Sequence, residues 1–230
     1  MDPTKDSNQT GERLSAESCE PIRFAGTTLG DYNHICALFH SPDEEYRALL
    51  PFIKEGLECG EKAVHVIDPQ LREEHLRRLG SVGIDAAAAE QSGQLELRNW
   101  RDVYLHDGHF DRNKTLALLK GVFDSAKQQG FPLTRLITRA GWAPEDRTGM
   151  NDLVEFETWV NYFLPRYYRD PVICVYDLAK FGADVVIDVM RTHPMIILGG
   201  ILQENPFFVP PDEFLRELQD REGRRTVASA

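Results

Sequence analysis

The alternation of short apolar runs with longer amphipathic segments is the feature that most restricts how this chain can fold. The apolar runs have the length of strands, and helix-like segments separate most of them. Strands are expected at 35–39, 63–67, 95–97, 133–138, 172–176 and 195–202. Strands that alternate with helices are typical of βαβ units. The sequence therefore predicts an α/β fold, in which helices cover both faces of a mainly parallel central sheet.

Helix boundaries support this alternation. After the first strand, Ser41 suits an N-cap, Pro42 suits the first helical position and Glu44 suits the third. An apolar stripe continues from there, and Gly60 is expected to end the helix. Further helices are expected at 71–79, 116–126, 153–163 and 183–191.

The two ends of the chain differ from the middle in composition. Residues 1–20 are polar and acidic, so we expect a flexible leader there. Residues 21–209 are expected to form one domain, and 210–230 a short amphipathic helix with a tail. The leader lacks the apolar core of a secretory signal, and no apolar run is long enough to span a bilayer. A cytoplasmic protein without membrane contact is therefore expected.

Charge and motif content exclude several functional classes. The chain has 26 Lys+Arg against 37 Asp+Glu, a net charge of −11, which disfavours direct nucleic-acid binding. It has no Gly-Lys dipeptide and hence no phosphate-binding loop of the Walker type. A dinucleotide-binding G-x-G, a G-x-S-x-G elbow and an H-E-x-x-H zinc motif are also missing. The segment after the first strand, Ser41 to Tyr46, carries three acids that would repel phosphate. No ATP hydrolysis and no cofactor are expected.

A ligand site is expected where parallel strands end, because α/β sheets bind ligands beyond the carboxyl ends of their strands. Arg139 would provide a planar set of hydrogen-bond donors, and Trp142 and Tyr176 an apolar wall with polar tips. The candidate ligand-binding residues are His34, Cys36, His40, Arg139, Trp142, Glu157, Tyr176 and Asp177.

Two histidine groupings leave alternatives open. His34 and Cys36 share a face if their segment is extended, so they are expected to line one wall of the pocket. Their other interpretations are a buried Cys beside a hydrogen-bonded His, or a soft-metal pair. His40, at the exit of the same strand, is the rival for the ligand role. His106 and His109 flank a turn and are expected to be solvated rather than metal-bound. No metal site is predicted.

The run from Phe52 to Pro69 resembles the segment that follows the phosphate loop in RecA/KaiC-like ATPases, although Ser41 to Tyr46 stands where that loop would lie. This combination is similar to the MEDS family of sensory domains. Further similar stretches are 34–36, 104–111, 173–177 and 193–194, and the resemblance covers about residues 31–208. It implies a RecA-like three-layer sandwich that has lost ATP hydrolysis. It also implies a signal-input role with simple hydrocarbon derivatives as ligands.

Three hypotheses follow. The first is a non-catalytic, cytoplasmic sensory domain that binds a small molecule and signals to a separate regulatory protein. The resemblance implies a histidine kinase, an anti-sigma factor or a transcription regulator as that partner, and a homodimer is left open. The second is a protein-interaction module without a ligand. The third is an enzyme of unusual type that uses His34 or Cys36.

Overall fold

A seven-stranded sheet forms the centre of the molecule. The computed structural model describes residues 21–30, 32–106, 108–140 and 149–228. The strand order is β11-β10-β3-β9-β8-β4-β5, and every neighbouring pair is parallel except β10 and β11. The strands are β3 (His34–Phe39), β4 (Lys62–Ile67), β5 (Leu95–Asn99), β8 (Thr134–Arg139), β9 (Val172–Asp177), β10 (Met195–Leu198) and β11 (Ile201–Glu204). The predicted α/β class with a mainly parallel sheet is confirmed.

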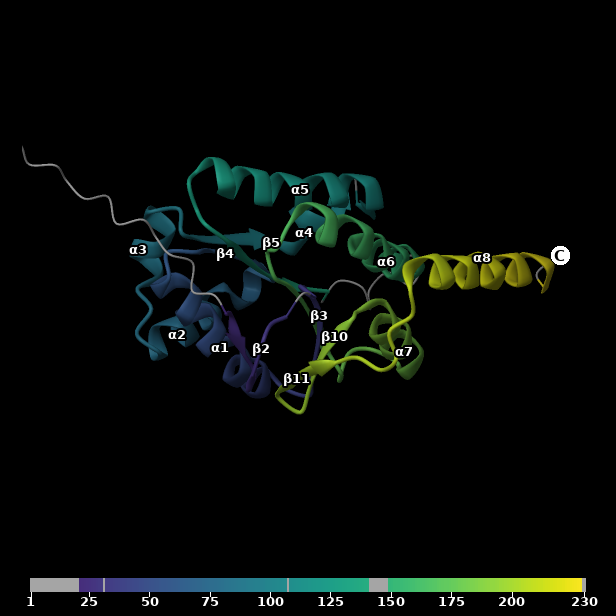
Figure 1. Ribbon diagram of the computed structural model, residues 1–230, viewed down its shortest axis with the longest axis horizontal. Helices are drawn as coiled ribbons and strands as arrows, with labels where there is room; N and C mark the ends of the chain where they lie inside the picture. Colours follow the sequence, from purple (N-terminus) through teal and green to yellow (C-terminus); the bar gives the residue numbers. More distant parts are fainter. Residues whose placement is uncertain (1–20, 31, 107, 141–148, 229–230) are drawn as a thin grey trace, which may run out of the picture.

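Helices cover both faces of this sheet (Figure 1). One core contains residues of α1 (Pro42–Glu58), α2 (Arg72–Ser81) and α3 (Ala86–Gln91). The opposite core contains residues of α4 (Trp100–Tyr104), α5 (Arg112–Gln128), α6 (Gly149–Tyr167), α7 (Ala183–Thr192) and α8 (Pro211–Ala228). The remaining elements are a 3-10 turn (Pro69–Leu71) and the hairpins β1 (Arg23–Phe24) with β2 (Thr27–Thr28) and β6 (Leu105–His106) with β7 (His109–Phe110).

Strand β3 is central, and its side chains alternate between the two cores. Cys36 and Leu38 lie in the core under α6, whereas Ile35, Ala37 and Phe39 lie in the core under α1. All six residues of the strand are buried. Pairing on both sides, with β10 and with β9, satisfies its backbone. The face that a residue occupies therefore decides which helices it contacts.

Two expectations about the carboxyl-terminal part are wrong. The segment 195–202 is a hairpin rather than one strand, because Gly199 and Gly200 take φ values of 60° and 77° and reverse the chain. The last helix is also longer than the short one expected, since it runs from Pro211 to Ala228 and points away from the body (Figure 1). Among the described residues, no helix combines the length and apolar character that crossing a membrane would require.

A buried ion pair ties α1 to β8. Arg135 and Glu61 are each about 1% exposed and are joined through Arg135 Nε. Arg135 Nη1 donates to the carbonyl of Phe52 at 2.6 Å and to Glu55 at 3.1 Å. A Cβ on Gly56 would lie 2.5 Å from Arg135 Nε. Gly56 is therefore required at this helix position, because the guanidinium is fixed by its partners and has no room to move.

Two histidines lie buried on the same side of the sheet, between β4 and α2. His75 Nδ1 is 2.8 Å from the Tyr46 hydroxyl, and His75 Nε2 is 2.9 Å from His65 Nδ1. Burial, and then the nearby charges of Arg139 and Arg72, lower the pKa of His75 to about 3. Burial lowers the pKa of His65 in the same direction, assisted by its histidine neighbour. Both rings are therefore neutral at neutral pH.

We predict opposite effects for two glycine substitutions in helices. Gly56→Ala should lower the free energy of unfolding by about 1–3 kcal/mol, because the added methyl group overpacks against Arg135. Gly121→Ala, in α5 with nothing within 4 Å of its Cβ position, should raise it by about 0.5–1 kcal/mol. Urea unfolding monitored by circular dichroism measures both. Equal effects of the two substitutions would contradict the packing at Gly56.

We also predict that stability falls with acid through His65 and His75. Their pKa values in the folded state lie below the unfolded value near 6.5. Below that pH the unfolded chain therefore binds more protons than the folded chain, which stabilises the unfolded state relative to the folded one. Each histidine contributes a loss of up to about 1.4 kcal/mol per pH unit below about 6.5. Urea unfolding of the wild type and of His75→Gln between pH 7 and 5 should show a shallower slope in the variant. Identical slopes would mean that His75 does not titrate this way.

Candidate functional site

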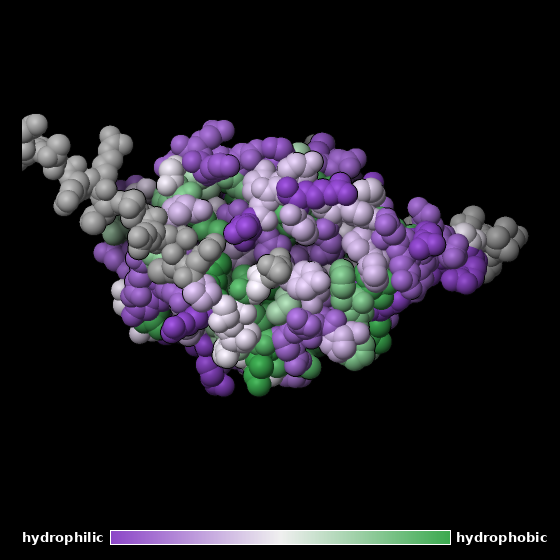
Figure 2. Space-filling model, viewed as in Figure 1, coloured by the Kyte–Doolittle hydropathy of each residue, from purple (hydrophilic) through white to green (hydrophobic). Residues whose placement is uncertain are grey.

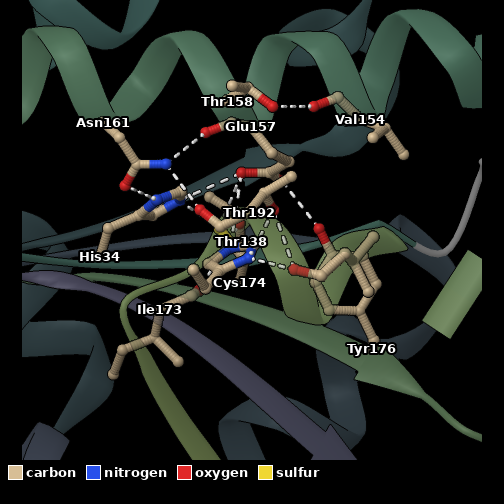
Figure 3. A network of polar contacts seen from close by, with 12 residues as sticks. His34, Thr138, Val154, Glu157, Thr158, Asn161, Ile173, Cys174, Tyr176 and Thr192 are labelled. Atoms are coloured by element: carbon tan, nitrogen blue, oxygen red, sulfur yellow. Dashed lines mark hydrogen bonds and ion pairs between the residues drawn. The ribbon is translucent and has the colours of Figure 1, made fainter. Parts of the chain in front are cut away.

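Four polar side chains converge in the core between the sheet and α6. His34 begins β3, Cys174 lies in β9, Glu157 lies in α6, and His193 follows α7. Glu157 Oε2 lies 3.1 Å from His34 Nε2, 3.6 Å from His193 Nε2 and 3.6 Å from Cys174 Sγ. Each of the four residues is at most 5% exposed. Figure 3 shows His34, Glu157 and Cys174 pointing toward one another.

Alternation along the strands and helical spacing bring these residues together. Cys174 and Tyr176 are two apart in β9, so both face α6. Glu157 lies in the buried stripe of α6 between Leu153 and Val160, where an apolar residue is usual. An unpaired carboxylate there would be costly, so its partners must compensate for the lost hydration.

Glu157 has partners at both carboxylate oxygens. Oε1 accepts a hydrogen bond from the Tyr176 hydroxyl at 2.8 Å, and Oε2 faces the two histidines. Burial by itself would raise the pKa of Glu157. The hydrogen bond with His34, the neighbouring histidine charges and the Tyr176 hydroxyl outweigh burial, and the pKa is lowered. The carboxylate is thus held in its ionised form inside the core.

The outer nitrogens of both imidazoles face neighbouring oxygens, a side-chain amide for His34 and a backbone carbonyl for His193. Asn161 donates to the carbonyls of Glu157 and Thr192 at 3.2 and 2.6 Å, and its Oδ1 is 3.0 Å from His34 Nδ1. His193 Nδ1 is 2.7 Å from the carbonyl of Val189. Each ring therefore turns its Nε2 inward. Burial, and then the neighbouring His34, lower the pKa of His193 to about 3, so its ring is neutral.

A small apolar cavity adjoins this cluster. Its volume is about 30 Å³, enough for a group of a few heavy atoms. Most of its wall is apolar, from strands β4, β8 and β9 and helices α4, α5 and α6, and includes Val64, Val103, Leu119, Leu136, Phe156 and Val160. His34, Glu157 and Cys174 contribute polar groups to the same wall. The arrangement combines a small apolar space with a polar end.

The eight candidate residues do not form one group. His34, Glu157 and Tyr176 meet in the cluster, and Cys36 lies beside Cys174 in the strand register, on the same face. These residues lie within the core rather than beyond the strand ends.

The remaining candidates lie elsewhere or outside the described residues. Arg139 and Asp177 line a separate cleft of about 170 Å³ at the carboxyl ends of the strands, where Arg139 pairs with Glu45. His40 is exposed. Trp142 lies outside the described residues, as does the leader 1–20.

Sequence reasoning missed Cys174 and His193 as members of the cluster. The available signal for Cys174 was its two-residue spacing from Tyr176, which places both on one face of a strand. His193 carried no such signal, because it follows α7 in the chain and reaches the cluster only through the crossover to β10. Tertiary structure alone brings it to Glu157.

The junction where a phosphate loop would lie is short and already hydrogen-bonded. Only His40 and Ser41 separate β3 from α1. Ser41 Oγ accepts from the amide of Glu44 at 3.3 Å, and the Glu44 carboxylate accepts from the amide of His40 at 2.9 Å. This capping box uses the amides that would otherwise bind phosphate.

Comparison with known proteins supports one family. The family model described as "MEDS: MEthanogen/methylotroph, DcmR Sensory domain" matches residues 33–194. The transcriptional repressor DcmR of Methylorubrum extorquens is 24% identical over 181 residues, which is 78% of this chain and 64% of the repressor. The chain thus spans less than two thirds of that relative.

Two solved structures are also similar. A KaiC-like protein from Pyrococcus horikoshii OT3 has a TM-score of 0.49 at 13% identity, over 74% of this chain and 71% of that one. The flagellar accessory protein FlaH from Methanocaldococcus jannaschii has a TM-score of 0.43 at 10% identity, over 74% and 75%.

We predict that the protein neither binds nor hydrolyses ATP at the β3–α1 junction, because its amides are already bonded and acids occupy the first turn of α1. Isothermal titration with Mg-ATP should give no saturable heat, and a phosphate-release assay should show no turnover. Saturable binding or turnover that is lost in Ser41→Ala would contradict this prediction.

Proposed function

Since this chain belongs to the MEDS sensory-domain family, we propose that it is a non-catalytic, cytoplasmic sensory domain that binds a small molecule and signals to a separate regulatory protein. The observation that carries the proposal is the small apolar cavity that ends at His34, Glu157 and Cys174. We assign the sensory unit to residues 21–209, and the output to the helix that follows.

The shape and chemistry of the cavity restrict the ligand. An apolar wall favours a hydrocarbon part, and a few converging polar groups fix the orientation of such a ligand. Glu157 and His34 offer the polar end a hydrogen-bond acceptor and an imidazole. A simple hydrocarbon derivative with one polar group fits these requirements, whereas a nucleotide is far too large for about 30 Å³.

The two free cysteines support a non-catalytic role. Burial, followed by the charge of Glu157, raises the pKa of both Cys36 and Cys174 well above the usual value. The thiolate is the nucleophilic form of cysteine, and it is disfavoured at both positions. This argues against the hypothesis of an enzyme that uses Cys36 for covalent catalysis.

A continuous set of contacts leads from the cluster to α8. Asn161 bonds both to His34 and to the carbonyl of Thr192, at the end of α7. The neighbouring Arg191 pairs with Glu217 of α8 at 2.6 Å and lies over the ring of the buried Phe214. A shift of α7 on ligand binding would therefore move α8, which projects from the body (Figure 1). This makes α8 our candidate for the element that contacts the regulatory protein.

The partner is proposed by class only. A transcription regulator is the first choice, because the curated relative is a transcriptional repressor that is longer than the matched region. A histidine kinase, an anti-sigma factor and a second copy of this chain are the other choices. Direct contact with nucleic acid is not part of the proposal, since the net charge is −11.

A ligand-free interaction module is the second candidate function. It is favoured by exposed apolar side chains at and after the β10–β11 hairpin, where Leu198, Ile201 and Phe207 are 45–61% exposed. Figure 2 shows hydrophobic residues gathered over the region of β11 and α7. The two functions differ in one measurable property, because only the first requires the cavity to be filled.

We predict that small polar hydrocarbons raise the melting temperature through this cavity. A thermal-shift screen of short alcohols, amines, carboxylic acids and esters should find stabilising compounds, since a ligand that binds only the folded state stabilises it. Val160→Leu extends a cavity-lining side chain and should abolish the shift. Val154→Leu, on the same helix and buried away from the cavity lining, should retain it. A wild type that no compound shifts, or a Val160→Leu variant that still responds, would favour the interaction module.

A further inference from the structure

The cluster around Glu157 has more hydrogen-bond acceptors than donors. His193 Nδ1 faces the carbonyl of Val189, which only accepts, so the ring proton is on Nδ1. His193 Nε2 then carries a lone pair, is fully buried and has no hydrogen-bond partner among the described residues. The only oxygen recorded near it is Glu157 Oε2 at 3.6 Å, which is also an acceptor.

His34 also turns a hydrogen-bond acceptor toward the cluster. The amide nitrogen of Asn161 donates to two carbonyls, so its oxygen faces His34 Nδ1 and accepts the proton there. When its ring is neutral, His34 Nε2 directs a second lone pair at Glu157 Oε2, 3.1 Å away, and a hydrogen bond between them needs a second proton on the ring. Three acceptor atoms therefore point at one volume inside the core. A positively charged species is what such an arrangement stabilises.

We propose that His34, Glu157, Cys174 and His193 form a binding site for a divalent transition-metal ion of the zinc type. Their four donor atoms all lie within 4.8 Å of one another, and all four residues are buried. Two imidazole nitrogens, a thiolate and a carboxylate are ligands that zinc accepts.

The distances fit tetrahedral coordination. Zinc binds nitrogen and oxygen at about 2.0–2.2 Å and sulfur at about 2.3 Å, so the ligand atoms of a tetrahedral site lie about 3.3–3.6 Å apart. The recorded separations are 3.1 Å between His34 and Glu157, and 3.6 Å from Cys174 Sγ to each of those two atoms. His193 Nε2 is 3.6 Å from the carboxylate. The separations of His193 Nε2 from His34 Nε2 and from Cys174 Sγ are at most 4.8 Å, so an ion would draw His193 inward.

The surroundings have the character of a metal site beyond the ligands themselves. Metal-bound histidines usually donate their other nitrogen to a backbone carbonyl or another oxygen, and here His193 faces Val189 and His34 faces Asn161. A divalent ion with one carboxylate, one thiolate and two neutral imidazoles has no net charge, which suits a buried position. The ion itself would stabilise the Cys174 thiolate.

A proton shared between His34 and Glu157 is the alternative explanation. It would satisfy that pair, but it leaves His193 Nε2 without a partner. A second proton on His193 is unfavourable, because the two rings lie against each other with centroids 4.1 Å apart. A metal ion satisfies all four groups at once. This site does not depend on the proposed sensory function, since its occupancy can be measured with no organic ligand present.

Cobalt is a suitable probe, because Co²⁺ replaces zinc and absorbs visible light. The full chain should be expressed in cobalt-supplemented medium, or refolded with excess Co²⁺, and then gel-filtered. We expect about one Co²⁺ per chain, with a thiolate-to-cobalt charge-transfer band and the strong visible bands of four-coordinate Co²⁺. Zn²⁺ should displace it and remove the colour.

Matched variants separate this site from other metal-binding groups. Cys174→Ser should lose the charge-transfer band. His193→Gln should weaken cobalt binding by at least about 10–100-fold, because a loss of that size is expected even when a residue that only contacts a metal ligand is changed. Cys36→Ser, beside Cys174 on β3, and His109→Asn, at an exposed position of β7, should keep the full spectrum and stoichiometry.

Two results would overturn the proposal. One is a wild-type chain that holds well under one metal ion after refolding in excess Co²⁺ or Zn²⁺. The other is retention of the full cobalt spectrum in both Cys174→Ser and His193→Gln. If either variant fails to fold, X-ray absorption of the zinc-loaded wild type decides the question. One sulfur and three nitrogen or oxygen neighbours support the site, and a shell without sulfur refutes it.

Discussion

The buried carboxylate of Glu157 is the constraint on which the rest of this structure depends. It occupies a position of α6 that packing alone would give to an apolar side chain, and it is 2% exposed. Leaving such a group unpaired would cost several kcal/mol. Tyr176 from β9, His34 from β3 and His193 after α7 all bond or face it. Because Glu157 needs these partners, α6 must keep its register on the sheet and the chain after α7 must keep its position.

Both faces of the sheet bury a carboxylate, and the two carboxylates have different partners. Under α1, Arg135 and Glu61 pair directly, and Gly56 leaves room for the guanidinium, whose Nε and Nη1 are hydrogen-bonded. Under α6, the carboxylate of Glu157 faces imidazoles rather than a guanidinium, and the ring of His193 is neutral. The permanent cation gives the first face a purely structural ion pair, whereas the second face is where we propose that an ion or a polar ligand binds.

The alternation of apolar runs and amphipathic segments was enough to predict the sheet and its helices, because those depend on local periodicity. Residue chemistry and position also placed His34, Glu157 and Tyr176 among the candidates for one site. Sequence reasoning failed for His193, whose place depends on how a crossover returns to the sheet. It also failed for Arg139 and Asp177, which lie at the strand ends as expected but in a different cleft. Local patterns predict elements, whereas shared sites depend on long-range packing.

The proposed site lies inside the core, whereas at the end of β3 several donors are already bonded to acids or to Ser41. The amide of Glu44 donates to Ser41, the amide of His40 donates to the Glu44 carboxylate, and Glu45 pairs with Arg139. A phosphate bound there would have to displace the Glu44 and Glu45 carboxylates from the groups that donate hydrogen bonds to them. On the α6 face the acceptors exceed the donors, so a ligand or ion adds an interaction and displaces none. We therefore propose binding between the sheet and α6, where a small displacement of α6 or α7 would be passed to α8 through Arg191 and Glu217.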